Sequence, residues 1–107
     1  MNTLTYRGAV RMSHIESIQD AIWQTHRCGS AHVESVPLVE RIREKVVFEG
    51  TVEVFNLINH PKSQRCYAWS DKDSNGEESY VAVLEIAPVT SPRTAVLASI
   101  VARMGKK

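Results

Sequence analysis

The spacing of apolar and polar residues predicts a helix near each end of the chain and four strands between them. The first helix begins at Ser13, because Ser13 and Glu16 have the spacing of a capping box. Isoleucines then recur on one face, and Gly29, which tolerates a positive φ, is expected to end the helix.

Two segments rich in β-branched and apolar residues follow and are expected to be strands, at 31–42 and 46–58. Pro37 cannot donate to a strand ladder, so the first strand should lie at a sheet edge and be interrupted or bulged there. Gly50 predicts a bulge or bend in the second strand. Two shorter strands, CYAWS and SYVAVLEI, complete the predicted sheet.

The segment DKDSNGEE, residues 71–78, joins the last two strands and has two interpretations. Its alternating acidic and amide side chains match the first half of a calcium loop of the EF-hand type. Such a loop also needs a carboxylate at its twelfth position, which here is Ala82, and helices on both sides. Asn75-Gly76 between apolar runs is instead a strong hairpin signal, so we interpret the segment as a turn.

A two-residue turn at Asn75-Gly76 fixes an expected register. It pairs Trp69 with Ala82, Tyr67 with Leu84 and Asp71 with Tyr80. The face carrying Tyr67 and Trp69 is bulky and is predicted to be the core side rather than a stacking platform for nucleic acid. The opposite face then carries Ala68, Val81 and Val83.

Ser91 as cap and Pro92 as first residue announce the last helix. Its predicted apolar stripe is Leu97, Ile100, Val101 and Met104. The order helix, four strands, helix predicts an α+β two-layer sandwich, with a four-stranded antiparallel sheet and both helices on one face. Residues 1–12 are expected to be a flexible extension, with Leu4 and Tyr6 as a potential extra edge strand, and residues 13–107 a single domain.

The composition and charge of the chain argue against several classes of function. The chain has 107 residues, 13 basic and 12 acidic, and a net charge of +1, so no bulk charge attracts nucleic acid or anionic lipid. No apolar run approaches the ~18 residues of a membrane span, and the start lacks the apolar stretch of a signal peptide. With only two cysteines, we expect a cytoplasmic protein with reduced thiols, and a Cys28–Cys66 disulfide is the less favoured alternative. No cofactor is expected.

The favoured interpretation is a small binding module without catalysis. The mixed face of Ala68, Val81 and Val83 is a candidate interface, and we expect a homodimer through it or through an open edge strand.

The alternative is a nucleic-acid-binding module that uses Lys62, Arg65 and Arg93. The predicted element order is shared by double-stranded RNA-binding domains, but the last helix here begins with one arginine and lacks their lysine-rich start. That likeness concerns the fold alone.

A third possibility is a metal or thiol site. Histidine and cysteine are ligands that zinc prefers, and the chain offers His26, Cys28, His32, His60 and Cys66. Their spacing matches no standard zinc motif. Cys66 with His60 has the composition of a nucleophile and base, but the sequence places no third group to orient them. No phosphate-binding glycine loop or serine elbow is present.

One segment resembles a known family. VEVFNLINHPKSQRCYAW, Val52 to Trp69, is similar to a stretch in short uncharacterised bacterial proteins in which a VEVF…GHPKA…CYAW pattern recurs. The resemblance implies a bacterial origin and a shared fold, and it implies no activity. The chain has Asn59 where the pattern has glycine, so the loop is expected to be built differently.

Overall fold

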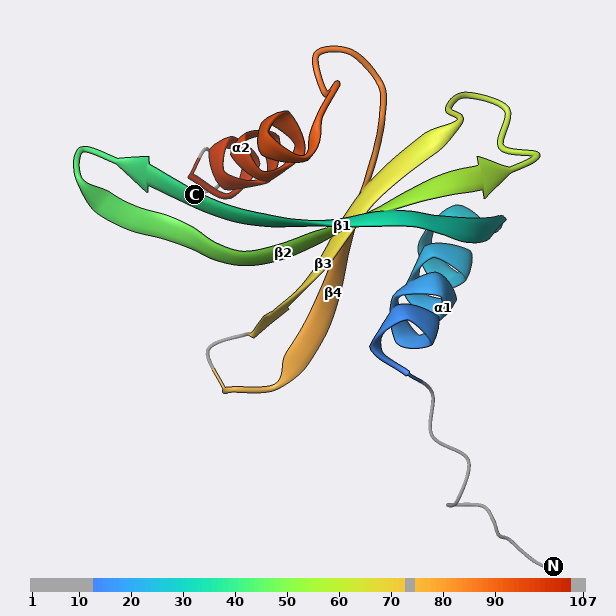
Figure 1. The fold of residues 1–107 in the computed structure, drawn as a ribbon, viewed down its shortest axis with the longest axis horizontal. Coiled ribbons are helices and arrows are strands. Elements are labelled where there is room, and N and C mark those ends of the chain that lie inside the picture. The colour runs from blue at the N-terminus through green and yellow to red at the C-terminus, as the bar shows by residue number, and fades with distance from the viewer. Residues whose placement is uncertain (1–12, 73–74, 105–107) are drawn as a thin grey trace, which may run out of the picture.

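The computed structural model describes residues 13–72 and 75–104 of the chain (Figure 1). The predicted extension at residues 1–12, with the edge strand proposed for Leu4 and Tyr6, therefore lies outside the described residues.

Two helices flank a four-stranded antiparallel sheet, which confirms the predicted α+β class and element order. The strands lie side by side in chain order, β1-β2-β3-β4. The elements are α1 (His14–His26), β1 (Gly29–Ile42), β2 (Lys45–Ile58), β3 (Arg65–Lys72), β4 (Glu78–Leu84) and α2 (Pro92–Met104). In the described part of the chain, no helix combines the length and apolar character needed to cross a membrane.

The predicted capping box forms at the start of α1. The Ser13 hydroxyl accepts from the Glu16 backbone N–H at 3.1 Å, and the Glu16 carboxylate accepts from the Ser13 backbone N–H at 2.9 Å. The predicted end is wrong by two residues. Arg27, with a φ of 57°, takes the left-handed position, and Gly29 is already the first residue of β1.

The strand irregularities also lie elsewhere than expected. Pro37 does lie on an edge strand, β1, but pairs with Thr51 in unbroken register. The extra residues are Val33 on β1 and Val47 on β2, where the pairing shifts by one. Side chains alternate between the two faces of a sheet along a strand. Each extra residue therefore reverses the face on which the residues after it would otherwise lie.

The turn between β3 and β4 is confirmed, but its predicted register is wrong by one residue. Trp69 pairs with Val81 and Tyr67 with Val83, where Ala82 and Leu84 were expected, and Asp71 pairs with Ser79 where Tyr80 was expected. The last pair is Lys72 with Glu78, so five positions of the chain separate the paired strands, where a two-residue turn was expected. A slip of one residue exchanges the two faces of β4.

The helices pack on opposite faces of the sheet, so the predicted placement on one face is wrong (Figure 1). Successive residues of β2 belong to different clusters: Val54 packs with α2, and Phe55 packs with α1. β3 behaves likewise, because Tyr67 and Trp69 face α2 whereas Cys66 and Ala68 face α1. The centre of the molecule therefore has three layers, a helix on each side of the sheet.

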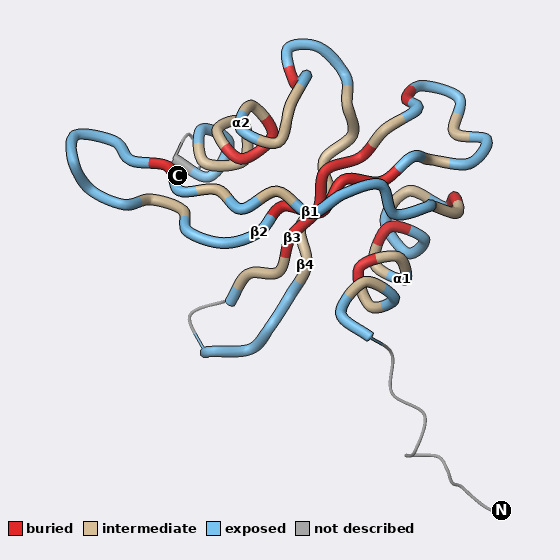
Figure 2. The backbone as a smooth tube through the Cα atoms, viewed as in Figure 1, coloured by how far each residue is buried: buried red, intermediate tan, exposed pale blue. Residues whose placement is uncertain are grey.

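Burial is concentrated where the three layers overlap (Figure 2). The predicted core position of Tyr67 and Trp69 is confirmed, since each is 2% exposed. Trp69 also meets the Phe48 ring edge-on, with centroids 5.8 Å apart.

The β1–β2 hairpin extends beyond both helices and is exposed at its tip (Figures 1 and 2). The radius of gyration is 15.4 Å, against about 12–13 Å for a compact domain of this length. Much of the surface therefore lies away from the central core.

Trp69→Ala should lower the free energy of unfolding by about 3–5 kcal/mol, because it leaves a cavity between the sheet and α2. Trp23→Ala is the matched control, since Trp23 is 49% exposed and should change stability by less than about 1 kcal/mol. Urea unfolding followed by circular dichroism measures both. Equal losses in the two variants would contradict the core position of Trp69.

Candidate functional site

The residues predicted to form an interface do not share a face. Ala68 is completely buried beneath α1. Val81 and Val83 lie on the other side of the sheet, partly buried against the cluster that contains α2. The register shift of β4 separates them, so the combined patch expected from the sequence is absent from the described residues.

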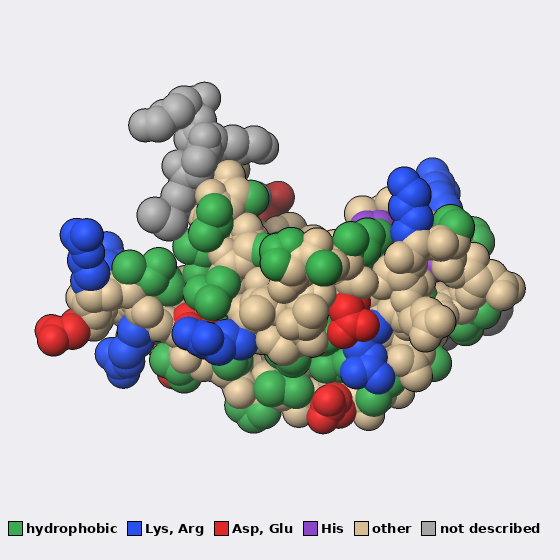
Figure 3. Space-filling view, turned by 90° about the horizontal axis from the view of Figure 1, so that it is seen from above, with side chains coloured by type: hydrophobic (Ala, Val, Ile, Leu, Met, Phe, Trp, Pro, Cys, Tyr) green, Lys and Arg blue, Asp and Glu red, His purple; other side chains and the backbone are tan. Residues whose placement is uncertain are grey.

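The three basic residues of the nucleic-acid alternative have different surroundings. Arg93 donates from Nε to the buried carboxylate of Glu40 at 2.9 Å, which ties the start of α2 to β1. Arg65 lies beside Tyr67, whereas Lys62 is exposed in the β2–β3 loop. On the face seen in Figure 3, Lys and Arg side chains stand in separate groups with acidic side chains between them. No continuous basic strip is visible on that face.

Tyr67 forms a partly buried polar contact on the α2 side of β3. Its hydroxyl donates to the carboxylate of Glu85, just after β4. Burial and this carboxylate raise the pKa of Tyr67 to about 12, and the nearby Arg65 guanidinium partly opposes the shift. The phenol therefore stays protonated at neutral pH and serves as a donor that joins β3 to the segment leading to α2.

Both cysteines are free and buried in the cluster beneath α1. Burial, and to a smaller extent the charge of the neighbouring Cys28, raise the pKa of Cys66 to about 12. Burial also raises the pKa of Cys28. A nucleophilic cysteine needs a lowered pKa and access to substrate. The environment of both thiols is the opposite, which argues against the predicted thiol site.

His26 and His60 hydrogen-bond to backbone groups. Nδ1 of His60 accepts from the backbone N–H groups of Lys62 and Ser63, at 3.0 and 3.2 Å, and so caps the β2–β3 loop. His26 lies 3.2 Å from the carbonyl oxygen of Ala82 and meets the His60 ring edge-on. Within residues 13–72 and 75–104, no three His, Cys, Asp or Glu side chains are placed to hold a metal ion.

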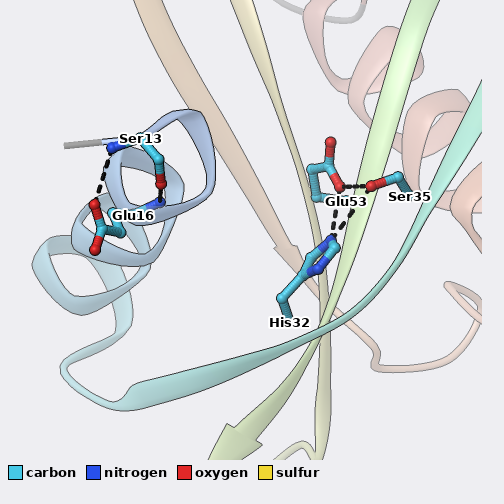
Figure 4. A network of polar contacts seen from close by, with 5 residues as sticks. All are labelled: Ser13, Glu16, His32, Ser35 and Glu53. Carbon is cyan, nitrogen blue, oxygen red and sulfur yellow. Dashed lines mark hydrogen bonds and ion pairs between the residues drawn. The ribbon is translucent and has the colours of Figure 1, made fainter.

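His32 takes part in a polar cluster together with Ser35 and Glu53 (Figure 4). Oε1 of Glu53 lies 2.8 Å from His32 Nε2 and also accepts from the Ser35 hydroxyl. Residues three apart on a regular strand point to opposite faces. Because Val33 is bulged out, His32 and Ser35 lie on the same face and reach the same carboxylate oxygen.

This cluster resembles a catalytic triad in composition but not in arrangement. In a serine triad the histidine uses one ring nitrogen for the acid and the other for the serine. Here the same nitrogen, Nε2 of His32, lies near both Glu53 and Ser35, and the Ser35 contact is long at 3.4 Å. The arrangement satisfies a buried carboxylate, since Glu53 is only 5% exposed, and it holds the edge strand β1 to β2.

One side of α2 is left largely uncovered by the sheet and is open to a ligand. We call it the outer face of α2; it consists of Thr94, Leu97, Ala98, Val101 and Ala102, of which Ala98 also packs, partly buried, against the core. With Pro88 these residues line an open groove of about 470 Å³. Val101 is 66% exposed, although valine is usually buried.

Sequence reasoning missed this face because it assigned the wrong stripe of α2 to the core. The residues that pack deepest against the sheet are Ala95 and Val96, and of the predicted stripe Ile100 joins them as a partly buried residue. The sequence of α2 did contain a sign of this second apolar side. Only Arg93, Thr94, Ser99 and Arg103 are polar in α2, so the helix is apolar on more than one side.

Comparisons of the chain with protein-family models, with curated proteins and with solved structures find no match. The resemblance of Val52–Trp69 to a bacterial family therefore stays a prediction. Asn59 has a φ of 61°, the left-handed conformation that glycine adopts freely and asparagine tolerates better than most residues. The glycine of the pattern and the asparagine of this chain thus suit the same backbone.

The two thiols should react with Ellman's reagent roughly 100-fold or more slowly in the folded protein than in denaturant. Raising the pH to about 9 should not make Cys66 reactive, because its thiolate forms only near its raised pKa of about 12. The folded state binds the proton of Cys66 more tightly than the unfolded state does. The stability that this protonated thiol contributes is therefore complete below the usual thiol pKa of 9.0, and it is lost as the pH rises toward 12. Fast reaction of one thiol in the folded protein would restore the thiol-site hypothesis.

Proposed function

We propose that the chain is a binding module without a catalytic step, that it associates as a homodimer, and that the outer face of α2 is its contact surface. The observation that carries this proposal is an apolar helix that its own sheet covers on one side only. A surface helix normally has one apolar stripe, and a helix apolar all round is normally buried. A second chain would cover the remaining side.

The charges of α2 favour an uncharged partner. Arg93 is paired with Glu40, and Arg103 lies 3.2 Å from Asp71 of the same chain. The outer face itself has four apolar residues and one threonine. A charged ligand finds no unpaired charge of α2 to select it, and two copies of this face meet without like-charge repulsion.

The sheet edges are less suitable for association than the helix. Pro37 removes a backbone donor from the middle of β1, and the bulge at Val33 disturbs the same strand. On β4, the carbonyl oxygen of Ala82 is already hydrogen-bonded to Nε2 of His26. These features hinder strand addition, which was the other route expected from the sequence.

Two further points complete the proposal. We expect the protein to work in the cytoplasm, because its two buried cysteines are free thiols. The nucleic-acid alternative is not favoured, because the carboxylate of Glu40 offsets the charge of Arg93. The enzyme alternative has no support from the polar cluster at Glu53, whose groups satisfy one another.

Val101→Lys should weaken self-association at least about 10-fold, because it places a charge in an apolar contact. Val39→Lys is the matched control: Val39 is also exposed, at 50%, but lies on β1 and pairs with Glu49. Sedimentation velocity over a wide concentration range measures both variants beside the wild type.

We expect a weak dimer. α2 is about 20 Å long and about 10 Å wide, so its outer face offers less than the ~800 Å² per partner of a standard interface. A dissociation constant on the order of 10–100 µM is consistent with such a contact. A wild type that stays monomeric at the highest concentration, or equal weakening by both substitutions, would contradict the proposal.

A further inference from the structure

Beyond the proposed function, we infer that the tip of the β1–β2 hairpin binds a nucleic-acid duplex in its groove. We call residues 41–46 the hairpin tip. This surface is separate from the basic residues of the nucleic-acid alternative, which lie in the β2–β3 loop, on β3 and on α2. It is also separate from the outer face of α2, so duplex binding does not require the chain to self-associate.

Basic side chains are concentrated at the hairpin tip, although the whole chain has a net charge of only +1. Arg41, Arg43 and Lys45 lie there together, with Glu44 as the acidic residue among them. All four are exposed, and the ion pairs in the described part of the chain involve other residues. The tip therefore has a local excess of positive charge, which attracts phosphate groups.

The turn at the hairpin tip keeps charged residues where other residues fit the backbone better. Arg43 and Glu44 have φ values of 53° and 69°, the left-handed conformation that a two-residue hairpin turn requires. Such turns favour Asn-Gly, which this chain has between β3 and β4, at residues 75–76. Strained backbone of this kind is typical of functional positions, so the arginine and glutamate here point to a role for the tip.

The positive charges lie on both faces of the narrow hairpin. Successive side chains on a strand point to opposite faces, and directly paired residues share a face. Lys45 pairs with Ile42, so it lies on the face opposite to that of Arg41. At the left end of Figure 3, which is the hairpin end in Figure 1, basic side chains accordingly stand on both sides of the molecule.

This distribution favours a nucleic-acid groove over a membrane surface. A groove has phosphates along both of its walls, and the major groove of B-DNA, about 12 Å wide, admits a two-stranded β-ribbon. A membrane presents its anionic head groups in one plane, which would suit charges on one face of the hairpin. Ile42 and Val46 are also exposed at the tip, and apolar contact with thymine methyl groups is part of major-groove recognition.

We expect weak binding that depends strongly on salt. Three phosphate contacts give a slope of about −2.7 in a plot of log K against log salt concentration, or about 20-fold tighter binding in about 50 mM than in about 150 mM NaCl. Fluorescence anisotropy of a labelled DNA duplex of mixed sequence, about 20 base pairs long, measures the binding constant of the full-length chain at both concentrations.

The combined variant Arg41→Gln, Arg43→Gln and Lys45→Gln should weaken binding to this duplex at least about 10-fold in low salt, and the salt slope should approach zero. Sedimentation velocity of the same variant should match the wild type, because α2 is unchanged. Failure of duplex binding and failure of the proposed homodimer are therefore observed separately.

The matched control combines Arg27→Gln, Lys62→Gln and Lys72→Gln. It removes the same charge from exposed positions outside the hairpin, so it should keep most of the affinity and the salt slope of the wild type. Equal weakening by the two triple variants would indicate attraction by net charge alone and would overturn the inference.

Arg43→Asn separates binding from folding, because asparagine tolerates a positive φ better than arginine does. The melting temperature should stay the same or rise, whereas the salt slope should become shallower by about 1. An unchanged slope would show that Arg43 contacts no phosphate and would overturn the inference.

Vesicles of phosphatidylcholine with about 30% phosphatidylserine provide the competing anionic surface. The wild type should bind the duplex more tightly than these vesicles at the same salt concentration. Binding to the vesicles without binding to the duplex, or binding to neither, would overturn the inference.

Discussion

The structure depends on burying the middle of β2 and β3 on both faces at once. Val52–Phe55 and Cys66–Trp69 are runs of buried residues, with no exposed position between them. Sheets with one solvated face alternate apolar and polar residues, so these unbroken runs need a covering layer on each side. α1 and α2 supply the two layers, and strand segments beyond them are exposed.

Buried carboxylates accompany this apolar centre and join elements distant in sequence. Glu53 holds β1 to β2 through His32 and Ser35, and Glu40 holds β1 to α2 through Arg93. A buried charge is costly unless it is paired. These side chains are therefore occupied within the fold, which supports the proposal that the chain acts by apolar contact.

The sequence predicted the helices and strands better than it predicted the strand register and the faces of the sheet on which the helices pack. Caps and turn residues act locally, so Ser13, Pro92 and Asn75-Gly76 identified two helix starts and a hairpin. Strand register, and the face of the sheet on which each side chain lies, depend on loop length and on β-bulges. Both faces of β4 are largely apolar, so the pattern contained no sign of the one-residue slip, and a bulged valine looks like any strand residue. The outer face of α2 was recognisable from its few polar residues, but assuming a single core side hid it.

The central proposal is that α2 has two apolar sides and that a second copy of the chain covers the outer one. Amide chemical shifts compared between dilute and concentrated samples test this claim without altering the protein. The account predicts concentration-dependent shifts at the outer face of α2 and beside Pro88, with the edges of β1 and β4 unchanged. Shifts confined to a strand edge, or none at any concentration, would contradict it.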